Sequence, residues 1–121
     1  MATMKSYTDI EQSKKLAEIL PLNSADMWWL YITAQGKHIA MMYEEPDPHY
    51  LTRMERYGIK DAAIRCWSLA ALLDVLPTFS IDSSDDHYYR LYCMERFTEW
   101  YDNAVDACYE MIIALSENGL I

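Results

Sequence analysis

The first strong pattern along the chain is helical. Between residues 10 and 20 apolar side chains recur on one broad face at 100° per residue, and lysines and a glutamate occupy much of the other face. Thr8 and Glu11 have the spacing of a capping box, in which two side chains satisfy backbone N–H groups of the first turn. Pro21 cannot continue a helix. The pattern predicts a helix over residues 9–20.

Two segments rich in aromatic and long apolar residues follow, residues 26–33 and 38–45. They flank Gly36, which adopts positive φ without a steric cost, and together they predict a β-hairpin. The alternation of a strand places Trp28 and Trp29 on opposite faces, and neither face is plainly polar. We therefore expect both faces of this hairpin to be covered.

Residues 44–64 contain two prolines and one glycine and predict a loop with about one turn of helix near residues 50–57. The clearest helix comes next. Ser68 is a suitable N-cap, a continuous stripe of leucines follows it, and Pro77 stands just past the end. These features predict a short buried helix over residues 68–76.

Strand-like alternation returns at residues 86–94 and 96–102 and predicts a second strand pair. Asp102 or Asn103 can then cap a last helix, and Gly119 stands where a left-handed residue ends it. The inward stripe of this helix is expected to comprise Val105, Cys108, Met111, Ile112 and Leu115.

The expected order is helix, hairpin, helix, hairpin, helix. It predicts an α+β fold in which small antiparallel sheets are covered by three helices, and a length of 121 residues suits a single domain over residues 1–121. An apolar content of 52% with only 3 Gly and 4 Pro excludes a disordered or fibrous chain. Residues 13–21 and 69–77 are faintly similar, each a helix end followed by proline, which indicates an internal duplication.

The charge is strongly acidic and unevenly distributed. The chain has 10 basic and 19 acidic residues, a formal net charge of −9. Beyond residue 81 the only basic residues are Arg90 and Arg96, against nine carboxylates: Asp82, Asp85, Asp86, Glu95, Glu99, Asp102, Asp106, Glu110 and Glu117. A surface of this sign repels phosphate backbones, so we expect no direct binding of nucleic acid. It is either a solvated face or one that meets a basic partner.

The same sequence favours a cytoplasmic protein. It has no uncharged apolar run of the length that spans a membrane, and its first fifteen residues contain no apolar core of a secretory signal. Cys66, Cys93 and Cys108 are odd in number and far apart, which suits reduced thiols better than disulfides.

No motif of catalysis or cofactor binding stands out. The 3 glycines are isolated, and the histidines and cysteines lack the spacing of a zinc site, so we expect no cofactor and no metal. Cys66 precedes a helix N-terminus and His87 could approach it, but Cys66 fits a hydrophobic staple better than a nucleophile. The polar stretch of residues 98–112 is best explained as a strand end, a cap and a helix. We expect a protein that is not an enzyme.

The chain contains more aromatic residues than the packing of its core requires. The chain has 10 Tyr, 4 Trp and 2 Phe, and two strand pairs under three helices leave part of one face bare. The residues predicted to form such a binding face are Trp28, Trp29, Tyr88, Tyr92 and Trp100. They predict a small non-catalytic interaction module that binds a protein partner, a small ligand or a second copy of itself.

Three segments, residues 7–27, 66–77 and 99–115, are together specific enough to compare with a family. The sequence resembles a family of short uncharacterised proteins of gut-dwelling bacteria and their mobile elements and phages. The resemblance implies a cytoplasmic, phage-associated context and supplies no activity, cofactor or catalytic residue. It raises an alternative function, an anti-defence or regulatory protein whose acidic C-terminal third imitates a phosphate backbone and occupies a basic groove.

Overall fold

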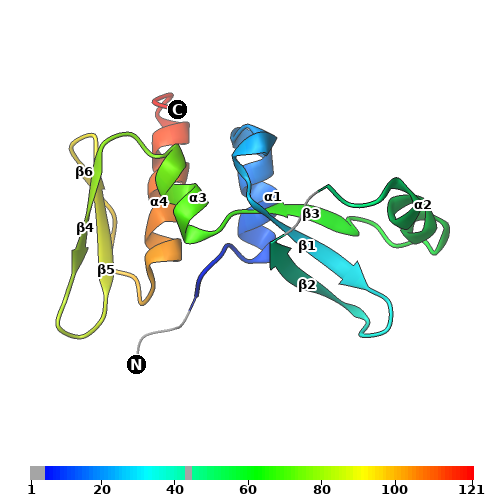
Figure 1. The fold of residues 1–121 in the computed structure, drawn as a ribbon. Coiled ribbons are helices and arrows are strands. Elements are labelled where there is room, and N and C mark those ends of the chain that lie inside the picture. The colour runs from blue at the N-terminus through cyan, green and yellow to red at the C-terminus, as the bar shows by residue number, and fades with distance from the viewer. Residues whose placement is uncertain (1–4, 43–44) are drawn as a thin grey trace. The chain divides into compact units, whose positions relative to one another are not determined.

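The computed structural model describes residues 5–42 and 45–121 and has an α+β fold with two small antiparallel sheets of three strands each (Figure 1). The contacts divide the described chain into two compact units. Residues 9–67 form what we call the N-terminal unit, and residues 5–8 together with 68–121 form the C-terminal unit. The single domain expected from the length of the chain stays a prediction.

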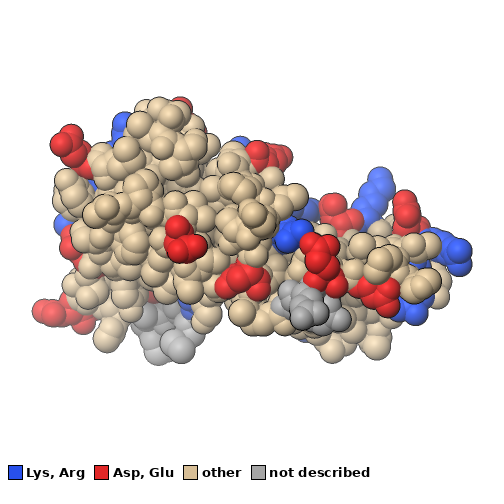
Figure 2. Space-filling view, turned by 45° about the horizontal axis from the view of Figure 1, so that its top comes forward, with Lys and Arg blue, Asp and Glu red and all other residues tan. Residues whose placement is uncertain are grey.

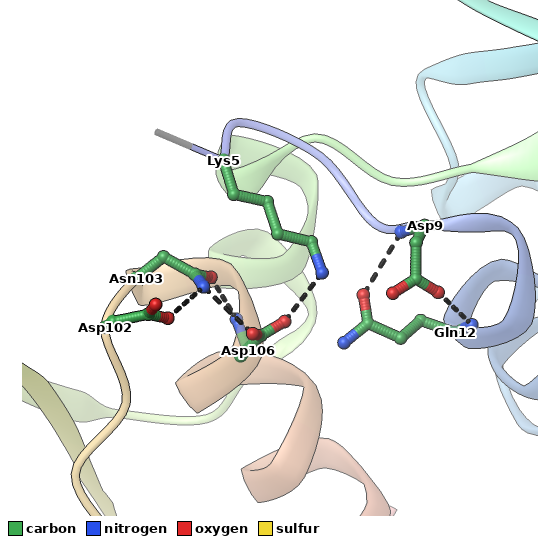
Figure 3. Close-up of polar contacts among 6 residues, drawn as sticks. All are labelled: Lys5, Asp9, Gln12, Asp102, Asn103 and Asp106. Carbon is green, nitrogen blue, oxygen red and sulfur yellow. Dashed lines mark hydrogen bonds and ion pairs between the residues drawn. The ribbon is translucent and has the colours of Figure 1, made fainter. Parts of the chain in front are cut away.

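The N-terminal unit begins with α1 (Ile10–Ile19), which confirms the predicted helix but not its predicted cap. Asp9 is the N-cap: its Oδ1 accepts the Gln12 N–H at 2.8 Å, and Gln12 Oε1 accepts the Asp9 N–H at 3.1 Å (Figure 3). The capping box is therefore one residue later than Thr8 and Glu11 predicted. Thr8, one residue before this cap, is fully buried.

The sheet of this unit has the order β2-β1-β3. The hairpin of β1 (Met27–Ile32) and β2 (Lys37–Met42) is confirmed. The antiparallel partner on the other side of β1, β3 (Ala63–Cys66), was not predicted, because four residues are too few for strand alternation to be visible. α1 packs against β3.

A second helix, α2 (Pro48–Arg56), replaces the single turn that was expected in the loop between the hairpin and β3. Asp47 caps it, with a carboxylate oxygen 2.9 Å from the His49 N–H, and proline occupies the first helical position, where its missing N–H costs nothing. Tyr50 anchors the helix to the sheet by donating its hydroxyl hydrogen to the Tyr31 carbonyl at 2.6 Å.

Both helices of the C-terminal unit were predicted. α3 (Leu69–Val75) begins at Ser68, whose hydroxyl oxygen accepts the Ala71 N–H at 3.2 Å. α4 (Ala104–Glu117) begins at Asn103, and Gly119 has a φ of 69° beyond its end. The predicted inward stripe is buried throughout: Val105, Cys108, Met111, Ile112 and Leu115.

The sheet of this unit is a meander of β4 (Phe79–Ser83), β5 (Tyr89–Cys93) and β6 (Arg96–Phe97). The expected strand pair is only partly right, because the longer partner of β5 is β4, which was not predicted, and β6 has two residues. Further along, the Thr98 hydroxyl accepts the Leu91 N–H at 2.9 Å. α4 packs against β5 (Figure 1).

The expected order of elements is therefore incomplete, since it lacks β3 and β4 and reduces α2 to a turn. The faint repeat is visible in the two helices: Leu16 and Leu72 are both 0% exposed, and Leu20 and Leu76 are both 7% exposed. The likeness ends there. The strand that follows the first helix is central in its sheet, whereas β4, which follows α3, lies at an edge.

In the described part of the chain, no helix has the length and apolar character needed to cross a membrane. The three cysteines form no disulfide, and all three are buried. Burial raises the pKa of the Cys93 thiol, and it raises the pKa of Cys108 from the ordinary value of 9.0 to about 12.

The stripe on α3 should carry much of the stability of the C-terminal unit. We expect Leu72→Ala to lower the free energy of unfolding by about 2 to 5 kcal/mol, because the side chain is fully buried and its removal leaves a cavity. Leu51→Ala on α2 is the matched control: Leu51 is 41% exposed, and the expected loss is about 0.5 kcal/mol. Urea denaturation measures both, and equal losses would contradict the prediction.

Cys108 should make the protein less stable at high pH. Above pH 9 the thiol ionises in the unfolded chain but not in the folded one, whose pKa is about 12, so stability falls as the pH rises between these values. The fall has an upper bound of ~4 kcal/mol. Urea titrations across this range should show a smaller fall in Cys108→Ala. An unchanged fall would assign it to other groups, such as Tyr50 and Tyr101, whose pKa burial also raises.

Candidate functional site

The polar cluster at the start of α4 could be taken for an active site, but its contacts are those of a helix cap. Asn103 is 4% exposed, and its Oδ1 accepts the Asp106 N–H at 2.8 Å. Its amide nitrogen donates to Asp102 Oδ1 and to Asp106 Oδ2, each at 2.9 Å (Figure 3). Asp102 thus orients the cap, and the predicted cap of the last helix is confirmed at Asn103.

Lys5 completes this network from the other end of the unit's sequence. Its Nζ lies 2.7 Å from Asp106 Oδ1, and both side chains are largely buried (Figure 3). An ion pair with this little exposure and a short charge-assisted hydrogen bond holds the N-terminal segment against the start of α4. No local sequence pattern could indicate this ion pair, because the two residues are 101 positions apart.

A different surface has the character of a binding site: the face of the β4-β5-β6 sheet that carries Arg90. Residues directly opposite in an antiparallel pair project from the same face. The register opposes Asp82 to Arg90 and Phe97 to Tyr92, so these four side chains share one face, while Leu91 and Cys93, both fully buried, belong to the other.

Arg90 is the centre of this face. Its guanidinium carbon lies 4.2 Å from the centre of the Phe97 ring and 4.7 Å from the centre of the Trp100 ring. One terminal nitrogen is 2.9 Å from Asp82 Oδ2. The Tyr92 and Phe97 rings are 4.6 Å apart. We call the set Tyr88, Arg90, Tyr92, Phe97 and Trp100 the Arg90 surface.

The Arg90 surface combines an arginine side chain that is fixed in position with aromatic rings that are exposed to solvent. Phe97 is 58% exposed, Tyr88 45% and Trp100 44%, so the three rings meet solvent over about half of their area. Arg90 itself is held by two rings and a carboxylate, and its Nε is buried without a hydrogen-bond partner among the described residues. A long side chain that is already immobilised loses little further entropy when a partner covers it.

Trp28 and Trp29 belong to the N-terminal unit and lie on opposite faces of β1. Trp28 takes part in a second arrangement of the same kind. The Arg65 guanidinium carbon lies 4.3 Å from the Trp28 ring centre, and a terminal nitrogen of Arg65 lies 2.9 Å from Glu45 Oε1. Both tryptophans are only partly exposed.

Of the five predicted binding residues, Trp100 contacts Arg90 and Tyr92 contacts Phe97, which also lies against Arg90. Tyr88 is exposed just before the same strand. The sequence analysis missed Arg90 and Phe97. Arg90 alternates in phase with Tyr88 and Tyr92, a signal that could have placed it on the same face. No pattern indicated the contact between Arg90 and Trp100.

The turn beside this surface is strained. Met94 and Glu95, which join β5 to β6, have φ values of 51° and 63°. A two-residue hairpin turn with positive φ at both positions usually contains asparagine and glycine, because side chains with a branched or long chain disfavour this conformation. Met94 is also 44% exposed. Strain of this kind is common at functional sites, where it is retained despite its cost.

Cys66 and His87, the two residues considered for catalysis, belong to different units. Cys66 is fully buried in β3, and His87 lies in the turn between β4 and β5, in the other unit. Over residues 5–42 and 45–121, no group of three or more histidines, cysteines and carboxylates is placed to hold a metal ion.

Comparison of the chain with protein-family models, with curated proteins and with solved structures gives no match. The resemblance to proteins of gut bacteria and their phages therefore stays a prediction.

Asn103 should contribute to stability and not to binding. Asn103→Ala removes the cap of α4 and leaves two carboxylates without its amide, so we expect a loss of about 1 to 3 kcal/mol. Asn118→Ala at the exposed C-terminal end of the same helix is the control and should cost less. Thermal unfolding measures both.

The double variant Asp102→Ala with Asn103→Ala should be less stable than either single variant and still fold. A double variant of undiminished stability that loses a binding partner would instead make this cluster a functional site.

Proposed function

We propose that the chain is a non-catalytic interaction module that binds a protein, either another protein or a second copy of itself, through the Arg90 surface. The observation that carries this proposal is the packing of Arg90 over the half-exposed rings of Phe97 and Trp100. Arginine, tryptophan and tyrosine are the residues that most often dominate the binding energy of protein interfaces.

The charge of the surface also suits a protein partner. Asp82 neutralises Arg90, so covering the pair does not bury an isolated charge. The rings supply apolar area, and the Arg90 side chain is already fixed in position. A partner gains most from such a site by placing apolar or aromatic side chains against it.

The alternative, an acidic face that imitates a phosphate backbone, has weaker support. Two of the carboxylates in the C-terminal third are already paired, Asp82 with Arg90 and Asp106 with Lys5. On the face shown in Figure 2, acidic side chains are separate groups, some among uncharged residues and some beside basic ones, and they do not form a continuous acidic surface. A mimic of nucleic acid needs closely spaced charges along one surface.

Crosslinking tests the proposal. A photoreactive benzoyl-phenylalanine in place of Trp100 should give a defined crosslinked product in cells that express the chain, either with one protein or as a covalent dimer. The same residue in place of Tyr57, which is 65% exposed and lies in the N-terminal unit, is the control and should not give that product. Absence of a product at position 100, or the same product at both positions, would contradict the proposal.

Mutations then measure the contribution of the rings. Trp100→Ala and Arg90→Ala should each weaken the interaction about tenfold or more, while Tyr57→Ala should leave it unchanged. Sedimentation equilibrium measures self-association, and titration of the purified partner measures a complex of two different proteins. Raised salt should leave the complex largely intact, whereas an acidic mimic would release its partner.

A further inference from the structure

A second binding surface is indicated in the N-terminal unit by the open edge of β3. The Tyr31 N–H donates to the Ala62 carbonyl at 2.8 Å, so these opposed residues form a hydrogen-bonded pair. Antiparallel strands alternate hydrogen-bonded and non-bonded pairs. Ile64 and Cys66 therefore also bond to β1, and the backbone N–H and C=O groups of Ala63 and Arg65 point away from the sheet.

These outward groups meet no other backbone in the part of the chain that the structure describes. No turn or loop hydrogen bond to the backbone of Ala63 or Arg65 is present there. Charged side chains often guard an edge strand of this kind. The Arg65 side chain does not, because it is held against Trp28 and paired with Glu45.

An open cavity of about 610 Å³ adjoins this edge. One of its walls is α2, which contributes Leu51 and Glu55, and the rest is the segment that leads from α2 into β3. Ala62 and Ala63 belong to the lining, so the cavity reaches the start of β3, where the first outward N–H lies. Leu51 and Ile59 make the lining partly apolar.

We propose that the cavity and the open edge of β3 form one groove, which binds an extended segment of a partner polypeptide as a fourth strand of the sheet. The backbone of that segment pairs with Ala63 and Arg65, and one of its apolar side chains enters the cavity beside Leu51. Hydrogen-bonding groups that recur every second residue, about 7 Å apart, match an extended peptide, and a pocket next to them selects one side chain.

This groove is independent of the Arg90 surface, because all of its residues belong to the N-terminal unit. If experiments exclude one of the two binding sites, the proposal for the other site still stands. Binding here needs no charge complementarity, since the affinity comes from main-chain hydrogen bonds and the specificity from the pocket.

The test uses a displayed library of random twelve-residue peptides selected on the wild-type chain. Ala63→Pro removes the outward N–H and places a ring over the edge without breaking a hydrogen bond to β1, and it should weaken the selected peptides about tenfold or more. Ile81→Pro is the matched control. In the pairing of β4 with β5, the Ser84 N–H bonds to the Tyr88 carbonyl. Hydrogen-bonded and non-bonded residues alternate from there along the strand, so the N–H of Ile81 on the edge strand β4 points away from the sheet.

Leu51→Gln provides a second variant that keeps the helix, since Leu51 is 41% exposed and glutamine is a good helix former. It should weaken the same peptides by removing the apolar wall of the cavity. Circular dichroism checks the folding of each variant, and amide hydrogen exchange should show new protection at Ala63 and Arg65 when the peptide is bound.

Three results would overturn the proposal: selection of no peptide, equal binding to wild type and to folded Ala63→Pro and Leu51→Gln, or equal weakening by Ile81→Pro.

Discussion

In the part of the chain that the structure describes, each sheet has only three strands and few helices to cover it, and this constraint determines what the surface can do. α1 packs against β3 in one unit and α4 against β5 in the other. A sheet covered on one face leaves the second face and both edges in contact with solvent or with small additional elements. The groups that are available to bind a partner therefore lie mainly on the faces and at the edges of the two sheets.

The two units have a similar arrangement of side chains on one face of their sheets. In each, an arginine from a strand lies over an aromatic ring and is paired with a carboxylate, Arg65 with Trp28 and Glu45, and Arg90 with Phe97, Trp100 and Asp82. The guanidinium covers the apolar ring with its planar surface while the carboxylate keeps its charge compensated. The difference lies in exposure, since Phe97 and Trp100 remain about half exposed.

The cap of α4 shows how a stretch of polar residues can resemble a site and be architecture. Lys5, Asp102, Asn103 and Asp106 satisfy one another and the first turn of the helix. The Arg90 surface is the opposite case, because Arg90 Nε is buried with no hydrogen-bond partner among the residues that the structure describes, and the neighbouring Met94–Glu95 turn keeps a disfavoured backbone conformation. Polar groups that are fully paired stabilise the fold, whereas unpaired polar groups and strained backbone are typical of places where a bound partner can add interactions.

Local patterns in the sequence determined the helices α1, α3 and α4, the β1–β2 hairpin, the α+β class and the burial of the α4 stripe, because helix periodicity, caps and prolines act over a few residues. Only the tertiary structure decided the rest. β3 and β4 are short strands that exist because a neighbouring strand supplies their hydrogen bonds, and the contacts of Arg90 with Trp100 and of Lys5 with Asp106 join residues that no local pattern connects. Such pairings depend on which surfaces the folded chain brings together, and neither alternation nor composition encodes that at short range.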